Sequence, residues 1–281
     1  MKNLLFYVLF LSIVSCNGQK KIEKNDSEKI NIEPTIEQTD KTIINNPKSK
    51  TADFHYKLIY NENLKIPKDA LNDMPPNVKA EFIKMINQEI HYSLSINENE
   101  SKYEIINNQN QTKEFSSEKE NNNNKTITKT NVKIEGIEIY KNFNTNKFLK
   151  RQSMGTKTYL INDELEKINW VLKTEKQKIG DFNCKKAILQ TNEGITIAWY
   201  TDEIPISEGP SMYYGLPGLI IKIEASDRNY ELIKFEKINE PLEIIKPKNG
   251  ININYLDFKK IISNTKKITV EEIINEEPAK D

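Results

Sequence analysis

The second half of the chain alternates short apolar runs with turn residues, and this pattern constrains the fold more than any other feature. Six such runs fall between residues 157 and 238, with the sequences KTYLIN, NWVLKTEKQKI, CKKAILQ, ITIAWYT, GLIIKIEA and YELIKFEKI. Asn, Asp, Gly and Ser residues separate them. Short runs of this kind are typical of strands, and their close spacing favours hairpins between neighbours. The pattern predicts an antiparallel meander.

Two earlier regions lengthen this meander toward the N-terminus. FHYKLIY (Phe54 to Tyr60) is a short aromatic-rich run, and HYSLSI and KYEII flank a polar turn in the manner of a hairpin. In NVKIEGIEIY the apolar phase changes at Gly136, which predicts a β-bulge that bends the sheet. The Asn-rich stretch EKENNNNKT is expected to be a loop. The sequence thus predicts a mainly β fold with about eight or more strands, with a curved half-barrel as one form of it.

One early amphipathic helix is also expected. Asn77 follows two prolines and is a good N-cap, and the segment from 77 to 88 carries an apolar stripe at helical spacing, formed by Val78, Phe82, Met85 and Ile86. The tail beyond residue 241 is polar and has room for a short helix in YLDFKKIISNTKKITVEEII.

The N-terminus has the pattern of an export signal. Lys2 precedes an apolar run from Leu4 to Val14 that is too short to span a bilayer. The next residues, IVSC (Ile13 to Cys16), resemble the lipobox of bacterial lipoproteins. That resemblance implies that Cys16 becomes the first residue of the mature protein and carries the lipids. Ordinary signal-peptidase cleavage after Gly18 stays open as an alternative.

The predicted domain organisation follows from composition. Residues 1–15 form the signal peptide, 16–50 a polar tether, 51–240 one β domain and 241–281 a polar tail. Hydrophobic residues make up 37% of the chain and charged residues 29%, which fits unpacked ends. Basic and acidic residues both number 41, so no net charge favours nucleic acid as a partner. We expect a lipid-anchored protein of the cell envelope. Asn17, in place of the Asp associated with inner-membrane retention in some bacteria, favours the outer membrane.

MYYGLPGLIIKI, from Met212 to Ile223, is the most apolar run outside the N-terminus. Pro217 and Gly218 occupy the two central positions of a turn, the placement that a type II turn requires because its second central residue needs positive φ. The strand that follows is apolar on both faces at its start, so both faces should be covered.

The hexapeptide GLPGLI (Gly215, Leu216, Pro217, Gly218, Leu219 and Ile220) is the one that names the GLPGLI family of envelope proteins. IGDFNCKKA, AWYTDEIP and YYGLPGLI resemble further elements of that family in the same order. The resemblance implies an exported β-rich domain and no established reaction. The layout is also similar to the half-barrel of periplasmic lipoprotein carriers, an analogy of fold alone.

Three functions follow from these patterns. The first is a non-catalytic binding or accessory module for an outer-membrane protein, a lipid or another apolar ligand, with a site lined by Trp199, Tyr213, Tyr214, Leu216 and Leu219. At strand spacing such residues are also typical core residues. The second is a structural subunit of an envelope complex.

The third function, an enzyme, is the least favoured. It would have to use Cys184 with His55 or His91, and none of them stands in a catalytic motif. A lone Cys on a strand is more typical of a small buried hydrophobe. We therefore expect no enzyme, no cofactor and no metal site.

Overall fold

The computed structural model describes residues 55–65, 79–80, 83–84, 87–106, 111–121, 124–134, 136–154, 157–192 and 194–263. The predicted signal peptide, the predicted lipidation site Cys16 and the predicted tether lie outside these residues, as does the end of the tail. The described strands are β1 (His55–Leu64), β2 (Ile90–Ile96), β3 (Glu100–Ile105), β4 (Gln111–Asn121), β5 (Asn124–Ile134), β6 (Glu138–Asn142), β7 (Lys147–Met154), β8 (Lys157–Glu164), β9 (Val171–Ile179), β10 (Phe182–Thr191), β11 (Gly194–Thr201), β12 (Leu219–Glu224), β13 (Arg228–Ile238) and β14 (Ile251–Ile253).

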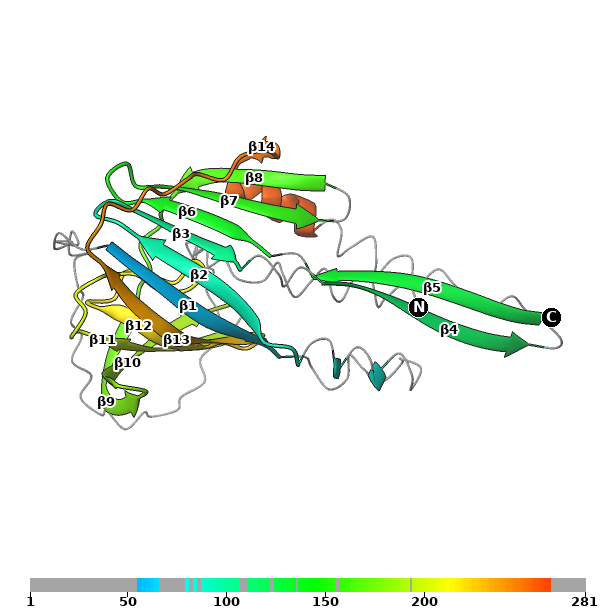
Figure 1. Ribbon diagram of the computed structural model, residues 1–281, viewed down its shortest axis with the longest axis horizontal. Coiled ribbons are helices and arrows are strands. Elements are labelled where there is room, and N and C mark those ends of the chain that lie inside the picture. Colours follow the sequence, from blue (N-terminus) through cyan, green and yellow to red (C-terminus); the bar gives the residue numbers. More distant parts are fainter. Residues whose placement is uncertain are drawn as a thin grey trace, which may run out of the picture.

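A 12-stranded sheet in the order β14-β8-β7-β6-β3-β2-β1-β13-β12-β11-β10-β9 forms the body of the molecule (Figure 1). The short strand β14 runs parallel to β8, and the other described neighbours are antiparallel. Strand β1 lies between two meanders, one formed by β2, β3, β6, β7 and β8 and the other by β9 to β13. The mainly β class and the antiparallel meander predicted from the alternating runs are confirmed.

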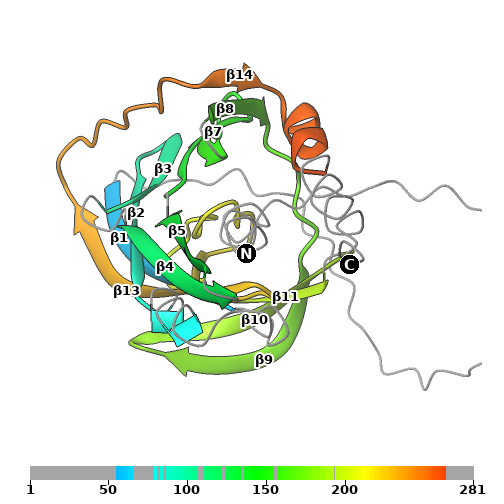
Figure 2. The ribbon, with the colours of Figure 1, turned by 90° about the vertical axis from the view of Figure 1, so that its right-hand side faces the viewer.

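The sheet curls strongly without closing into a barrel (Figure 2). The chain passes from Glu164, at the end of β8, to Val171, at the start of the edge strand β9. Seven residue steps span at most about 25 Å, so these two distant parts of the sheet lie near each other at this end. Register shifts within three strand pairs, at Ile59/Tyr60, Lys185/Ala187 and Trp199/Tyr200, mark irregularities of the kind that bend sheets.

The bulge predicted at Gly136 is wrong. The run NVKIEGIEIY does not form one bent strand, because β5 and β6 belong to different sheets. Gly136 lies between them, where a Cβ atom would stand 2.4 Å from Cβ of Ile105. The glycine is needed there for close packing against the end of β3.

Strands β4 and β5 form a separate two-stranded sheet that extends away from the body (Figure 1). Their register is unbroken from Gln111↔Ile134 to Asn121↔Asn124. The Asn-rich stretch, predicted as a loop, therefore supplies the ends of two long strands.

The structure also corrects the position of the helix. The one continuous helix of the described residues covers 255–263 in the predicted tail. Asn254 caps it, since its Oδ1 accepts the amide of Asp257 at 2.8 Å, and Phe258 is buried against Tyr159. Of the early segment, the described residues 79–80 and 83–84 are helical, and none of these four is buried. The residues of the predicted apolar stripe, Val78, Phe82, Met85 and Ile86, lie outside the described residues. Within the described residues, no helix is both long and apolar enough to cross a membrane.

The inner face of the curled sheet carries the core. Tyr60, Tyr92, Tyr103 and Tyr230 lie buried there on neighbouring strands, and the rings of Tyr92 and Tyr103 stack with centroids 4.7 Å apart. On the same two strands as Tyr60 and Tyr230, Arg228 Nη1 donates to Glu62 Oε1 at 2.7 Å, and both side chains are buried. This face is covered by the connection between β11 and β12.

Candidate functional site

The connection between β11 and β12, residues 202–218, contains the GLPG part of the hexapeptide and is called the motif loop here. It lies inside the curl of the sheet (Figure 2). Its two arms are joined by hydrogen bonds, from Gly215 N to Ser207 O at 3.1 Å and from Ser207 Oγ to Leu216 O at 2.7 Å. Tyr60 also donates its hydroxyl to the carbonyl of Ile220, where the loop enters β12. The motif loop is therefore a fixed part of the core.

Glu208 anchors the motif loop to the opposite half of the sheet. Its Oε2 lies 2.8 Å from Nζ of Lys141 on β6, and its Oε1 accepts the hydroxyl of Ser101 on β3 at 2.9 Å. The Lys141 and Glu208 side chains are 0% and 2% exposed. Burial lowers the pKa of Lys141, and the neighbouring Glu208 carboxylate works in the opposite direction. This buried ion pair links two meanders that are far apart along the chain.

Gly218 serves a different purpose from the one predicted. It does not have the positive φ of a type II turn, and Gly215 is the glycine of the hexapeptide that does, with φ of 88°. A Cβ atom at position 218 would lie 2.0 Å from the carbonyl oxygen of Thr201. The glycine thus lets the end of the motif loop pass directly over the end of β11, and the type II turn is wrong.

The five residues predicted to line a binding site lie in three different places. Tyr213, Leu216 and Leu219 are buried in the core. Trp199 shares the strand phase of Ile195, which is 55% exposed, and is half-buried on the outer face under the ammonium group of Lys186. Tyr214 is 6% exposed and lines a pocket.

The start of β12 is covered on both faces, as its apolar sequence predicts. Leu219, Ile220 and Ile221 are all buried. Successive residues of a strand point to opposite faces, so three buried residues in a row require cover on each side.

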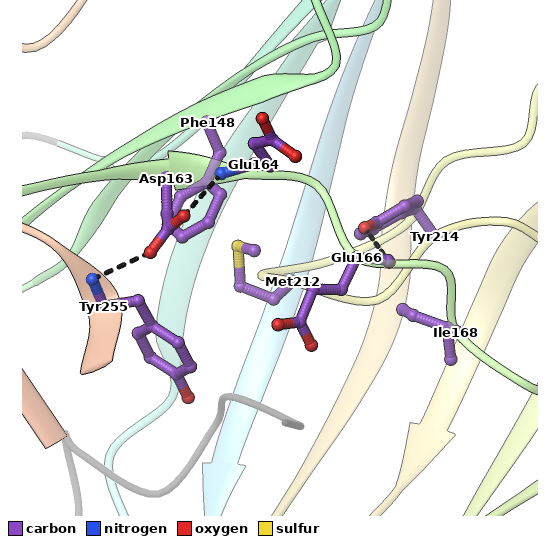
Figure 3. A pocket seen from close by; sticks show the side chains of 8 residues that line it. All are labelled: Phe148, Asp163, Glu164, Glu166, Ile168, Met212, Tyr214 and Tyr255. Carbon is purple, nitrogen blue, oxygen red and sulfur yellow. Dashed lines mark hydrogen bonds between the residues drawn. The ribbon is translucent and has the colours of Figure 1, made fainter. Parts of the chain in front are cut away.

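The pocket lies where the motif loop reaches the surface, beside the β8–β9 connection (Figure 3). Strands β7 and β8, that connection, the motif loop and the C-terminal helix all contribute to it. Its lining residues are Phe148, Asp163, Glu164, Glu166, Ile168, Met212, Tyr214 and Tyr255. Three carboxylates, three aromatic rings and two aliphatic side chains therefore converge, and no basic residue is among the lining residues.

Hydrogen bonds join the segments that surround this pocket. The Tyr214 hydroxyl donates to the carbonyl of Glu166, and Trp170 Nε1 donates to the carbonyl of Tyr214 at 2.9 Å. Asp163 accepts the amides of Glu164 and Tyr255 at 2.9 and 3.0 Å, one on each carboxylate oxygen (Figure 3). Asp163 thus joins β8 to the start of the helix, while Glu164 and Glu166 remain at exposed positions.

Sequence reasoning missed most of this pocket. The acidic residues stand in an ordinary polar connection, and Tyr255 is 92 residues away from Asp163 along the chain. Of the residues that line the pocket, only Tyr214 was among those predicted from the sequence to line a binding site. The pairing of β14 with β8 brings the tail to this place, and no local pattern predicts that pairing.

The three residues considered for an enzyme are not brought together. Cys184 is buried on β10, and burial raises the pKa of its thiol to about 11, so the reactive thiolate is scarce at neutral pH. His91 pairs with Asn61, about 20 Å along β1 from His55. Strands β11, β12 and β13 lie between Cys184 and β1. Within the described part of the chain, no group of three or more His, Cys, Asp or Glu side chains is placed to hold a metal ion.

Comparison with known proteins gives one family. Residues 188–222 match the family model Porph_ging, a protein of unknown function. This stretch runs from β10 through the motif loop into β12 and includes GLPGLI. No curated protein matches the chain.

Among solved structures, two crystal forms of PNGF-II, in space groups C2 and P21, are similar at 18% identity and a TM-score of 0.47. The match covers 74% of this chain and 32% and 33% of those chains, so this chain spans about one third of their length. A likeness at this level supports no conclusion on function.

Proposed function

We propose that the protein is an envelope lipoprotein, anchored by lipids on Cys16 in the outer membrane, that acts as a non-catalytic binding module for a protein partner. The observation that carries this proposal is the pocket at which the motif loop reaches the surface. The matched family region and this pocket share Met212 and Tyr214. The separation of Cys184 from His55 and His91 supports a role without nucleophilic catalysis.

The filled inner face favours a protein partner over an apolar ligand held within the curl. Leu216, Leu219 and Tyr213 are buried there against the sheet. Ligand sites for apolar molecules are open concavities, and here the motif loop occupies the concave side. A partner would instead meet the acidic and aromatic rim of the pocket.

A structural subunit of an envelope complex remains the second candidate, and one surface favours it. On the outer face Val171, Ile188 and Ile197 stand side by side in the register of β9, β10 and β11. Val171 is 51% exposed, and Ile195 on the same face is 55% exposed. Apolar side chains gathered on an outer sheet face are typical of contact surfaces.

Site-specific photocrosslinking in native membranes tests the two candidates. Benzoylphenylalanine at position 166, in the pocket, is expected to capture one defined protein, and the same group at the exposed position 234 serves as the control. Capture from position 195 and none from 166 would replace the binding module by the structural subunit. An absence of adducts from both positions would contradict both candidates.

The anchor has its own prediction. Cys16→Ala is expected to abolish metabolic fatty-acid labelling and to release the protein from the membrane fraction, because the acylated cysteine is the proposed attachment. Cys184→Ala is the matched control and should keep the label. Label that persists in Cys16→Ala, or a mature N-terminus directly after Gly18, would show that Cys16 is not the site of lipid attachment.

A further inference from the structure

The pocket combines an apolar wall with an acidic rim, an arrangement that suits a long side chain with a cationic end. Phe148, Ile168 and Met212 provide apolar surface, and the carboxylates of Glu164 and Glu166 belong to exposed residues (Figure 3). Lysine side chains bury their methylene groups against apolar surface and keep the ammonium group at a polar edge. Resting on the proposed function, we propose that this pocket binds a lysine side chain of the protein partner.

The aromatic residues of the pocket already contact ammonium groups of the chain itself. Lys259 Nζ lies 4.3 Å from the ring centroid of Tyr255, and Lys141 Nζ lies 5.4 Å from that of Tyr214. Ammonium groups within about 6 Å of a tyrosine ring are attracted by its negative face. These two ring faces are thus already occupied, and the partner's lysine would meet the carboxylates of Glu164 and Glu166 instead.

Other ligand classes fit less well. Both oxygens of Asp163 are taken by backbone amides, which leaves two exposed glutamates and no ligand set for a divalent cation. A lipid headgroup with an amine also carries a phosphate, which three nearby carboxylates would repel. A lysine side chain brings a cation without an attached anion.

The exposed carboxylates of the pocket determine the affinity that we expect for a lysine probe. An exposed ion pair contributes little, so Nα-acetyl-lysine-N-methylamide should bind with a dissociation constant in the millimolar range. Loss of both exposed carboxylates should weaken that binding about tenfold. Affinity of this size suits one anchoring residue within a larger contact.

Methyl NMR of the full-length lipoprotein in detergent micelles tests the proposal. The probe is Nα-acetyl-lysine-N-methylamide, and the reporter is the methyl group of Met212, assigned by its loss in Met212→Leu. We expect a saturable shift of this signal that weakens about tenfold in Glu164→Gln/Glu166→Gln. Glu236→Gln, a change at an exposed glutamate on β13, should leave it unchanged.

Three results would overturn the inference. They are equal binding of the neutral norleucine analogue, unchanged binding by the double variant, and a Met212 shift caused by phosphatidylethanolamine vesicles but not by the lysine probe. Failure here is distinguishable from failure of the proposed function. A partner crosslinked from position 166 without any probe binding would leave the binding module standing, whereas probe binding without a crosslinked partner would remove it.

Discussion

Glu208→Ala is expected to lower the free energy of unfolding by about 3–5 kcal/mol, because it leaves the buried ammonium group of Lys141 without its partner. The substitution also removes the acceptor of Ser101 and one tie between the motif loop and β3. Urea denaturation followed by tryptophan fluorescence measures the change, provided that the transition is two-state.

A double variant separates the effect of the unpaired charge on the free energy of unfolding from the effect of the lost packing. Lys141→Met/Glu208→Leu removes both charges at similar volume and should recover most of the lost stability, because buried ion pairs are commonly replaceable by packed apolar residues. If the double variant were as unstable as Glu208→Ala, the unpaired charge would not be the cause.

The stability deficit of Glu208→Ala should also shrink as pH rises. Burial lowers the pKa of Lys141, and loss of Glu208 removes the influence that opposes this lowering. Between that lowered pKa and the ordinary lysine value of about 10.4, the unfolded chain binds more protons than the folded one, so stability rises with pH. A deficit that stays constant from neutral pH to about pH 10 would contradict the burial of a charged Lys141.

Gly218→Ala is expected to cost about 3 kcal/mol or more, since the added Cβ would meet the carbonyl oxygen of Thr201 at 2.0 Å. The obstacle is backbone at the end of β11 and not a flexible side chain, so relief requires the motif loop to move. Denaturant unfolding or the midpoint of thermal unfolding reports the loss.

Gly180→Ala is the matched control. Gly180 has φ of 56° but open space around the position of a Cβ, so this change should cost only about 1 kcal/mol of conformational strain. A Gly218→Ala variant no less stable than Gly180→Ala would mean that the close approach to Thr201 is not maintained.

Local sequence patterns predicted those parts of the fold that depend on neighbours in the chain. Strand β10 pairs with β11, with Thr191 opposite Gly194, and β12 pairs with β13, as the close spacing of the apolar runs predicts. Alternation and turn residues act over a few positions, which is the distance across which hairpins form. For this reason the meander was predictable and its strand order across β1 was not.

The errors come from contacts between distant parts of the chain. The Leu-Pro-Gly sequence satisfies the local rule for a type II turn. Gly218 is needed instead because its backbone passes close to the carbonyl oxygen of Thr201 on a neighbouring strand. Likewise, Trp199 and Tyr213 were predicted to line one site, because local patterns do not show which side of the sheet the motif loop covers. The pocket needs four separate segments, and only Tyr214 was anticipated in it.

The pairing of β1 with β13 has a consequence for how the domain forms. Partners in this pair, such as His55 and Ile238, lie about 165 to 185 residues apart in sequence, while paired strands within each meander lie much closer together along the chain. Closing so long a loop costs entropy before any pairing compensates for it, and sheets with high contact order fold slowly. The two meanders can therefore nucleate early, but the hydrogen-bonded join between them must wait until nearly the whole domain has been synthesised.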